Sequence, residues 1–277
     1  MTMKKHGTVV TRRGILQRAG GLLTAAAFGG VLRAEEAVSP AMAKLSAYMS
    51  EASSRALPDD ILEKTKHHIL DSFAAMISGT QLGPGQVAIR FARAHAGETV
   101  ATVVGSDVVC GAIEAALANG MLAHSDETDD YSPVGTHPGS AVVPAALATG
   151  EQFAIDGPRF IRSVTLGYDI AGRVAATLGG QAFNHDGHKA IHGFTGTFGA
   201  ASAAGCAAGL NAQQMRWLLD YASQQASGLA AWQRDTEHVE KSFVFAGMPA
   251  RNGVTAALLV QLGGTGVTDV LSGADNF

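Results

Sequence analysis

The sequence gathers ionisable groups in one short stretch, HSDETDDYSPVGTHPG, which begins at His124. Residues 124–130 hold one histidine, four carboxylates and two hydroxyls, and a second histidine follows at His137. Carboxylates and imidazoles that crowd one another can exchange protons near neutral pH, because their surroundings shift their pKa values. The stretch predicts an acid–base site in which Glu127 and His137 form the exchanging pair and Asp130 supports them.

Two other interpretations of this stretch remain open. A solvent-exposed loop can carry such charge without any function. Carboxylate oxygens could also hold a metal ion, although the alternating D-x-D-x-D-G spacing of a calcium loop is missing. The acidic residues Glu127, Asp129 and Asp130 follow a predicted helix end, where negative charge is unfavourable. Solvent, a cation or basic side chains from elsewhere in the fold must therefore compensate them.

His137 stands directly before Pro138, so its backbone is expected to be extended and to lie just ahead of a helix. The positive end of that helix would disfavour an imidazolium. A neutral imidazole in this place could act as a base or bind a hydroxyl of an anionic substrate. Backbone N–H groups at the same helix start could hold a carboxylate.

Histidines also gather in the segment NHDGHKAIHGFTGTFG, residues 184–199. His185, His188 and His192 lie in a glycine-rich connection that leads into a predicted helix. The four-residue spacing of His188 and His192 is weak evidence for a metal site. The segment therefore leaves both loop histidines and functional histidines open.

A polar segment, RDTEHVEKSFVFAGMPARNG, interrupts two apolar helical patterns at residues 234–253. It is either a solvated excursion or the lining of a cleft. In the second case Asp235, His238, Lys241 and Arg251 would face the cleft. A lysine and an arginine together suit a substrate that carries carboxylates.

From about residue 40 onward the chain predicts one helix after another. Apolar residues recur at helical spacing in two segments, and His124 shares the apolar face of the second. These residues are Ile61, Thr65, Ile69, Phe73 and Ile77, then Ile113, Leu117 and Met121. Pro138 and Pro158 suit first helical turns, Asn211 suits an N-cap, and Gly179 suits a helix end.

Strand patterns are scarce, and TVATVV at residues 99–104 is the one real candidate. The helix predicted over residues 196–210 carries a stripe of glycine and alanine, which lets another backbone approach closely. We expect this helix to lie in the core. The predicted fold class is all-α, a large helical bundle over residues 40–277.

The first 34 residues read as a leader segment. Basic residues come first, an apolar stretch follows at residues 19–32, and Ala34 suits a cleavage site. The sequence TRRGIL at residues 11–16 resembles the twin-arginine export signal. Because the apolar stretch is too short to span a bilayer, we expect a periplasmic protein without a stable membrane anchor. A disordered basic tail is the alternative.

Composition excludes several classes of partner. The formal net charge is −4 with both signs mixed, which argues against binding to nucleic acid or to an anionic membrane. The two cysteines, Cys110 and Cys206, sit in Ala/Gly-rich helical stretches and are expected to be small buried side chains. Two lone cysteines make no zinc or iron–sulfur ligand set.

Several motifs in sequence together resemble one family. HSDETDDY…THPGSAVVPAAL, GTFGAASAAG and SGL…DTEHVEKSF…GMPARNGVTAALL follow one another in the order and spacing of the MmgE/PrpD family. DSFAAMISGT at residues 71–80 resembles an early helix of that family. The resemblance runs from about Ser46 to the end of the chain.

This resemblance implies a large helical domain that contributes most of the active site. Family members normally continue into a smaller α/β domain that closes over the substrate, and they usually form homodimers. We expect the 277-residue chain to lack that second domain, so that a separate chain would have to supply it. The resemblance also implies chemistry without a metal or another cofactor, on small di- and tricarboxylic acids.

Matching positions assign roles by resemblance. Glu127 stands where many members have an aspartate, and Asp130 matches the second of a pair of aspartates. Tyr131 stands where a threonine is common and is expected to bind substrate. His137 matches the histidine of the family's H-P motif. The resemblance therefore implies catalytic roles for Glu127, Asp130 and His137.

Other positions depart from the family pattern. Ala190 stands where many members have a histidine, and His188 and His192 flank it. The lysine of a common G-K-A motif is missing at residues 247–249, so Lys241 or Arg251 would supply the positive charge. These departures imply a substrate other than 2-methylcitrate.

The expected function is lyase chemistry, a dehydration or a decarboxylation, on a small di- or tricarboxylate. In this hypothesis His137 or Glu127 takes the proton α to a carboxylate, and His188 or His192 handles the leaving group. Basic side chains would hold the substrate carboxylates. An incomplete half-enzyme that only binds carboxylates is the serious alternative, and a metal-dependent hydrolase is the third.

Overall fold

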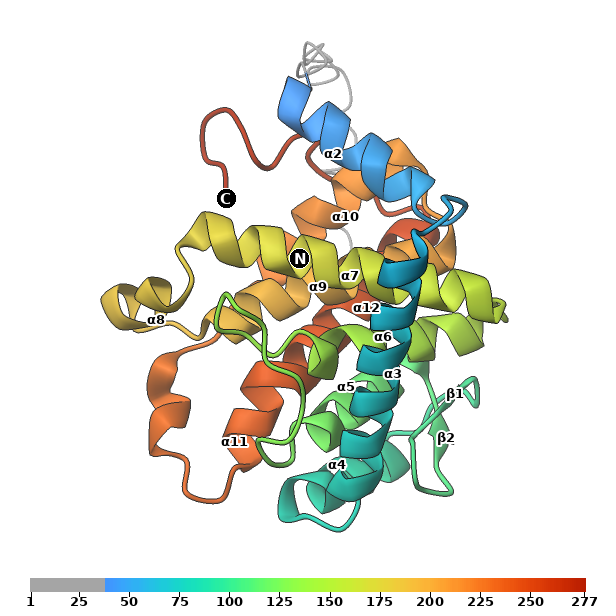
Figure 1. Ribbon diagram of the computed structural model, residues 1–277, viewed down its shortest axis with the longest axis vertical. Helices are drawn as coiled ribbons and strands as arrows, with labels where there is room; N and C mark the ends of the chain where they lie inside the picture. The colour runs from blue at the N-terminus through green and yellow to red at the C-terminus, as the bar shows by residue number, and fades with distance from the viewer. Residues whose placement is uncertain (1–37) are drawn as a thin grey trace, which may run out of the picture. The chain divides into compact units, whose positions relative to one another are not determined.

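The computed structural model describes residues 38–277, and helices build most of this part of the chain (Figure 1). The expected all-α class is confirmed. The leader expected over residues 1–34 lies outside the described residues. The helices are α2 (Pro40–Glu51), α3 (Asp59–Gly79), α4 (Gly83–Ala94), α5 (Ala112–Ala123), α6 (Gly139–Gln152), α7 (Gly157–Leu178), α8 (Gln181–Gly187), α9 (Ile191–Ala208), α10 (Ala212–Gln225), η1 (Ala230–Arg234), α11 (Val239–Ser242), η2 (Phe243–Gly247) and α12 (Met248–Gln261).

Helix α9 is the centre of the bundle and packs against α6, α7, α10 and α12. Its small side chains are buried along almost its whole length, so the prediction that it lies in the core is confirmed. A Cβ added to Gly253 of α12 would lie 2.4 Å from the backbone nitrogen of Ala201. The α9–α12 contact therefore depends on a residue without a side chain, because only then can the two backbones come this close.

The predicted helix ends are confirmed. Asn211 and Gln214 form a reciprocal capping box at the start of α10. Gly179 closes α7 in the left-handed conformation, with φ of 88°. Pro158 lies in the first turn of α7, and Pro138 directly precedes the first residue of α6. Local sequence thus sets where these helices begin and end.

Helix α3 forms as predicted, but its packed face differs from the apolar stripe that we expected. Ile61 and Ile77 are 40% and 56% exposed, whereas Ser72 and Gly79 are buried. The reason is a close approach to α5: a Cβ on Gly79 would lie 2.1 Å from the carbonyl oxygen of Leu122. At this contact α3 presents a glycine because a larger residue would prevent the approach, whereas Met76 is the large side chain that α3 buries.

The expected strand at residues 99–104 forms only in part. Ala101 and Thr102 pair antiparallel with Cys110 and Val109, which makes a two-stranded sheet of β1 (Ala101–Thr102) and β2 (Val109–Cys110). Cys110 and Cys206 are buried, as predicted, and both are free. The small hairpin covers one end of α5 and α6.

Residues 239–261 form one long helix that changes its winding in the middle. Pro249 has no N–H to donate to the carbonyl of Phe245, four residues earlier. The turn of η2 that precedes Pro249 is a π-helix, which accommodates the missing bond. By length and composition this helix is apolar enough to cross a membrane. However, 72% of its most apolar 18-residue stretch is buried inside the protein. It therefore serves as a core helix here.

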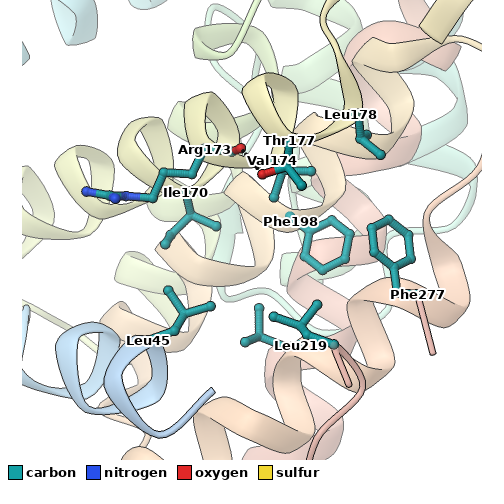
Figure 2. Close-up of a pocket in the computed structure, with 10 residues that line it drawn as sticks. Leu45, Ile170, Arg173, Val174, Thr177, Leu178, Phe198, Leu219 and Phe277 are labelled. Carbon is teal, nitrogen blue, oxygen red and sulfur yellow. Dashed lines mark hydrogen bonds between the residues drawn. The ribbon is translucent and has the colours of Figure 1, made fainter. Parts of the chain in front are cut away.

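An apolar cavity of about 270 Å³ lies where α2 packs on the bundle (Figure 2). Leu45 of α2, Ile170 of α7, Phe198 of α9 and Phe277 line it. Arg173 also borders the cavity, but its guanidinium points away from the two phenylalanine rings in Figure 2 and binds Asp169 at 2.8 Å. With no polar group directed inward among the labelled residues, the cavity belongs to the packing of the core.

Gly253→Ala should destabilise the protein by about 1–3 kcal/mol, because the added methyl would meet the backbone of α9. Gly172→Ala in α7 is the matched control. A Cβ there meets nothing within 4 Å, so alanine should stabilise the helix by roughly 0.5–1 kcal/mol. Urea unfolding of both variants measures the two effects. Equal stabilities would contradict the close α9–α12 contact.

Candidate active site

A buried carboxylate, Asp129, holds two imidazoles together. Its Oδ1 lies 2.8 Å from Nδ1 of His124 and 3.3 Å from Nδ1 of His137, and its side chain is fully buried. Burial alone would raise the pKa of Asp129, but the hydrogen bond with His124, the close approach of His137 and the charges of both imidazoles lower it to about 2. Asp129 is therefore a carboxylate at any physiological pH, and it needs both imidazoles because an unpaired buried charge is costly.

Two helix ends and the segment between them bring these three groups together. His124 caps the C-terminus of α5 and is completely buried, on the apolar face where the sequence places it. His137 comes two residues before the start of α6. Asp129 lies in the connecting segment, which runs beside α11 in Figure 1. The site is thus built where helices end.

The prediction that the helix start lowers the pKa of His137 is wrong. Burial does lower its pKa, but the closely approaching carboxylate of Asp129 and its charge raise it above the ordinary value. The start of α6 has little effect because Asp130 accepts a hydrogen bond from the N–H of Gly139, at 3.0 Å. A carboxylate already offsets the positive end of the helix.

His192 adds a third imidazole to the cluster, from the start of α9. Its ring stacks on Phe245 with centroids 3.7 Å apart and lies 5.7 Å from the ring of His137. Burial, followed by the charges of His137 and His124, lowers the pKa of His192 to about 3. This imidazole is therefore neutral near pH 7, so it can donate one hydrogen bond and accept another.

The π-helical turn of η2 places Phe245 in the middle of the site. Its ring stacks on His124 with centroids 4.9 Å apart, and it meets the edge of Trp232 at 4.6 Å. Such turns are common at functional sites because they redirect side chains within a helix. Phe245 gives the imidazoles an apolar wall, which strengthens electrostatic interactions inside the cluster.

Lys241 of α11 forms an ion pair with Glu127 across the mouth of the cluster. The lysine nitrogen also lies over the rings of Trp232 and Phe245, 5.2 and 5.1 Å from their centroids. Burial raises the pKa of Glu127, but the hydrogen bond from Lys241 and its charge bring it below the ordinary value. The predicted compensation of the acidic segment is therefore provided by basic side chains of the fold.

Several polar atoms of the cluster have no hydrogen-bond partner within residues 38–277. They are His124 Nε2, Asp129 Oδ2, His137 Nδ1, His192 Nδ1, Trp232 Nε1 and His238 Nε2. Buried polar atoms are nearly always paired, because each unpaired one costs free energy. A group of them in one place fits a site that receives a polar ligand. Ligand atoms of His124, Asp129 and His137 also lie within 4.8 Å of one another, so a cation could compete for them.

The structure does not bring all the predicted residues into the cluster. Tyr131 is exposed, with its ring 5.2 Å from that of His137 at the mouth of the site. His188 is exposed, whereas His192, its predicted alternative, is buried with the others. Arg251 binds Asn252 and borders a groove that includes none of the clustered histidines. Asp130 points toward α3 and α6 instead of toward the rings.

Sequence reasoning missed the partner of His137. We paired His137 with Glu127, and the structure pairs it with Asp129, two residues away in the same acidic stretch. His124 was recognised as apolar-facing but not as a site residue. The sequence does not predict that Phe245 belongs to the site. Its one indication is Pro249, four residues later, which disturbs the helix at this turn. Spacing along a loop does not say which carboxylate turns inward.

Asp129→Asn should lower the pKa of His137 by roughly one to two pH units, because the charge that stabilises its imidazolium is lost. Asp126→Asn is the control, since Asp126 bonds only to Thr128 within its own turn. Histidine NMR titration reads the two variants directly. A His137 titration that does not change in Asp129→Asn would contradict the assigned pair.

Known proteins match most of the part of the chain that the structure describes. The family model of the MmgE/PrpD N-terminal domain matches residues 43–277. A cis-aconitate decarboxylase-like protein of Aspergillus oryzae is 28% identical over 238 residues, which is 82% of this chain and 48% of the relative. The human cis-aconitate decarboxylase is 29% identical over 225 residues, or 78% and 45%. That of Aspergillus terreus strain NIH 2624 is 28% identical over 239 residues, or 83% and 47%. The chain spans about half the length of these relatives.

Proposed function

The chain belongs to the MmgE/PrpD family, and from this premise we propose that its histidine cluster binds a small di- or tricarboxylic acid and removes a proton α to a carboxylate. The observation that carries the proposal is the buried Asp129 with two imidazoles, beside unpartnered polar atoms and one lysine. Relatives named as cis-aconitate decarboxylases support a tricarboxylate as the ligand class.

His137 is the proposed base. Its Nδ1 faces Asp129, so Nε2 is the atom that would take the proton. A carboxylate behind an imidazole orients the ring and stabilises the cation that forms, as in other acid–base sites. Because Asp129 raises the pKa of His137, the neutral ring is a stronger base than an isolated histidine. In a decarboxylation, loss of CO₂ would itself leave the electron pair on carbon, and the imidazolium form of His137 would then donate a proton to that carbon.

Lys241 is the proposed carboxylate subsite. Glu127 places its own carboxylate on this lysine, which supports a carboxylate as the group that Lys241 would bind. A substrate carboxylate would displace Glu127, whose side chain is about half exposed and can swing into solvent. The neutral His192 would donate a hydrogen bond to a leaving hydroxyl or to a second carboxylate. We assign no contact with substrate to His188 or Arg251.

One alternative has a specific observation in its favour. Because the chain spans about half of its relatives, the cluster could bind a carboxylic acid without turning it over. Groups from the other half would then complete the reaction. Binding and turnover must therefore be measured separately.

Lys241→Met should weaken binding of cis-aconitate about tenfold or more, because a charged hydrogen bond contributes roughly 1.5–3 kcal/mol. Lys189→Met is the matched control, since Lys189 lies over Phe183 and Phe194, outside the cluster. Titration calorimetry with cis-aconitate and citrate gives both affinities. Equal loss in the two variants, or no binding by the parent chain, would contradict the proposed subsite.

Turnover of cis-aconitate, citrate and 2-methylcitrate, followed by product analysis, should disappear in His137→Ala and persist in His185→Ala, whose imidazole is exposed. In the dehydration of citrate or 2-methylcitrate, with His137 as the base, the rate should rise with pH through its raised pKa, since only the neutral ring accepts a proton. Activity that requires added metal, or that is unchanged in His137→Ala, would overturn this mechanism. Binding without turnover in the parent chain would favour the alternative.

A further inference from the structure

Asp130, the neighbour of Asp129, sends its carboxylate in the opposite direction. Its Oδ2 lies 3.0 Å from Nδ1 of His68 on α3, and its Oδ1 accepts the N–H of Gly139 at 3.0 Å. The side chain of Asp130 is only 10% exposed, and that of His68 is 29% exposed. Two consecutive carboxylates thus link the histidine cluster on one side to α3 and α6 on the other.

The first turn of α6 is tightly enclosed at this point. A Cβ on Gly139 would lie 2.5 Å from Asp130 Oδ1 and from the hydroxyl of Tyr168, and 2.8 Å from the hydroxyl of Ser72. Groups from α3 and α7 therefore converge on the backbone of one glycine. The start of α6 has little freedom to move while Asp130 keeps its place.

His137 is joined to this anchor by a single residue. That residue is Pro138, whose ring restricts φ, here −69°. A displacement of Gly139 would consequently move His137 relative to Asp129. Asp129 contacts His137 at 3.3 Å and His124 at 2.8 Å. A small displacement would therefore break the contact with His137 first.

We propose that His68 is a positioning residue for this site: it orients Asp130, which fixes the start of α6 and so holds His137 against Asp129. This inference rests on the proposed function, in which His137 is the base. His68 itself touches none of the groups assigned to substrate. It acts through Asp130 and the backbone.

The charges around His68 explain why its loss would matter. Asp71, also on α3, and Asp130 face it, and the ring of Tyr168 of α7 lies 4.8 Å away. Burial raises the pKa of Asp71, and the charges of Asp130 and Asp129 raise it further while His68 lowers it. Without the imidazole, Asp130 would keep two carboxylate neighbours and lose the side chain of α3 that contacts its Oδ2. It would then turn away from Gly139.

The test compares three variants of the full chain. His68→Leu removes the imidazole that contacts Asp130. His68→Asn keeps a polar nitrogen close to the position of Nδ1. His67→Leu changes the preceding residue, which is exposed. His68→Leu should lower the pKa of His137 in an NMR titration and reduce kcat about tenfold or more, with KM within about twofold. His68→Asn should restore most of both effects, and His67→Leu should behave as the parent.

The outcomes separate this inference from the function on which it rests. If His68→Leu lowers the melting temperature but leaves the titration of His137 unchanged, His68 is merely structural and the inference is wrong. If the parent chain shows neither binding nor turnover of a carboxylic acid, the proposed function fails. In that case the titration of His137 still decides whether His68 positions it.

Discussion

The cost of burying the carboxylate of Asp129 is the constraint on which this site depends. A charge withdrawn from water must be matched by donors in good geometry, or it destabilises the fold by several kcal/mol. Asp129 is matched by a hydrogen bond with His124 and by the close imidazole of His137, which stand at the end of α5 and ahead of α6. The same contacts that make the buried charge tolerable also fix two helix ends and raise the pKa of His137.

Close helix packing makes room for this arrangement. Gly253 and Gly79 let backbones approach where any side chain would collide, and α9 supplies small residues along the centre of the bundle. The long helix over residues 239–261 must then pass the site with Pro249 inside it. The π-helical turn before this proline turns Phe245 onto His192 and His124. The helix that packs in the core therefore also supplies an aromatic side chain to the site.

Electrostatic balance divides the cluster into parts with different tasks. His192 is kept neutral by burial and by its neighbours, whereas His137 is made more basic by Asp129. Pairs of titratable groups whose pKa values move apart are typical of acid–base sites. Lys241 and Glu127 neutralise each other at the mouth, and in the proposed function a substrate carboxylate would take the place of Glu127.

The sequence by itself determined the helices, their caps, the buried core helix and the segment from which most of the clustered ionisable side chains come. These follow from periodicity, from Asn211 and Gly179 at helix ends, and from the density of ionisable residues after His124. Tertiary structure alone decided that Asp129, and not Glu127, faces His137, that α3 packs through Ser72 and Gly79, and that Phe245 joins the histidines. The reason is physical: local patterns report the preferences of the backbone, whereas the partner of a side chain depends on elements that are distant in sequence and on how closely they can approach.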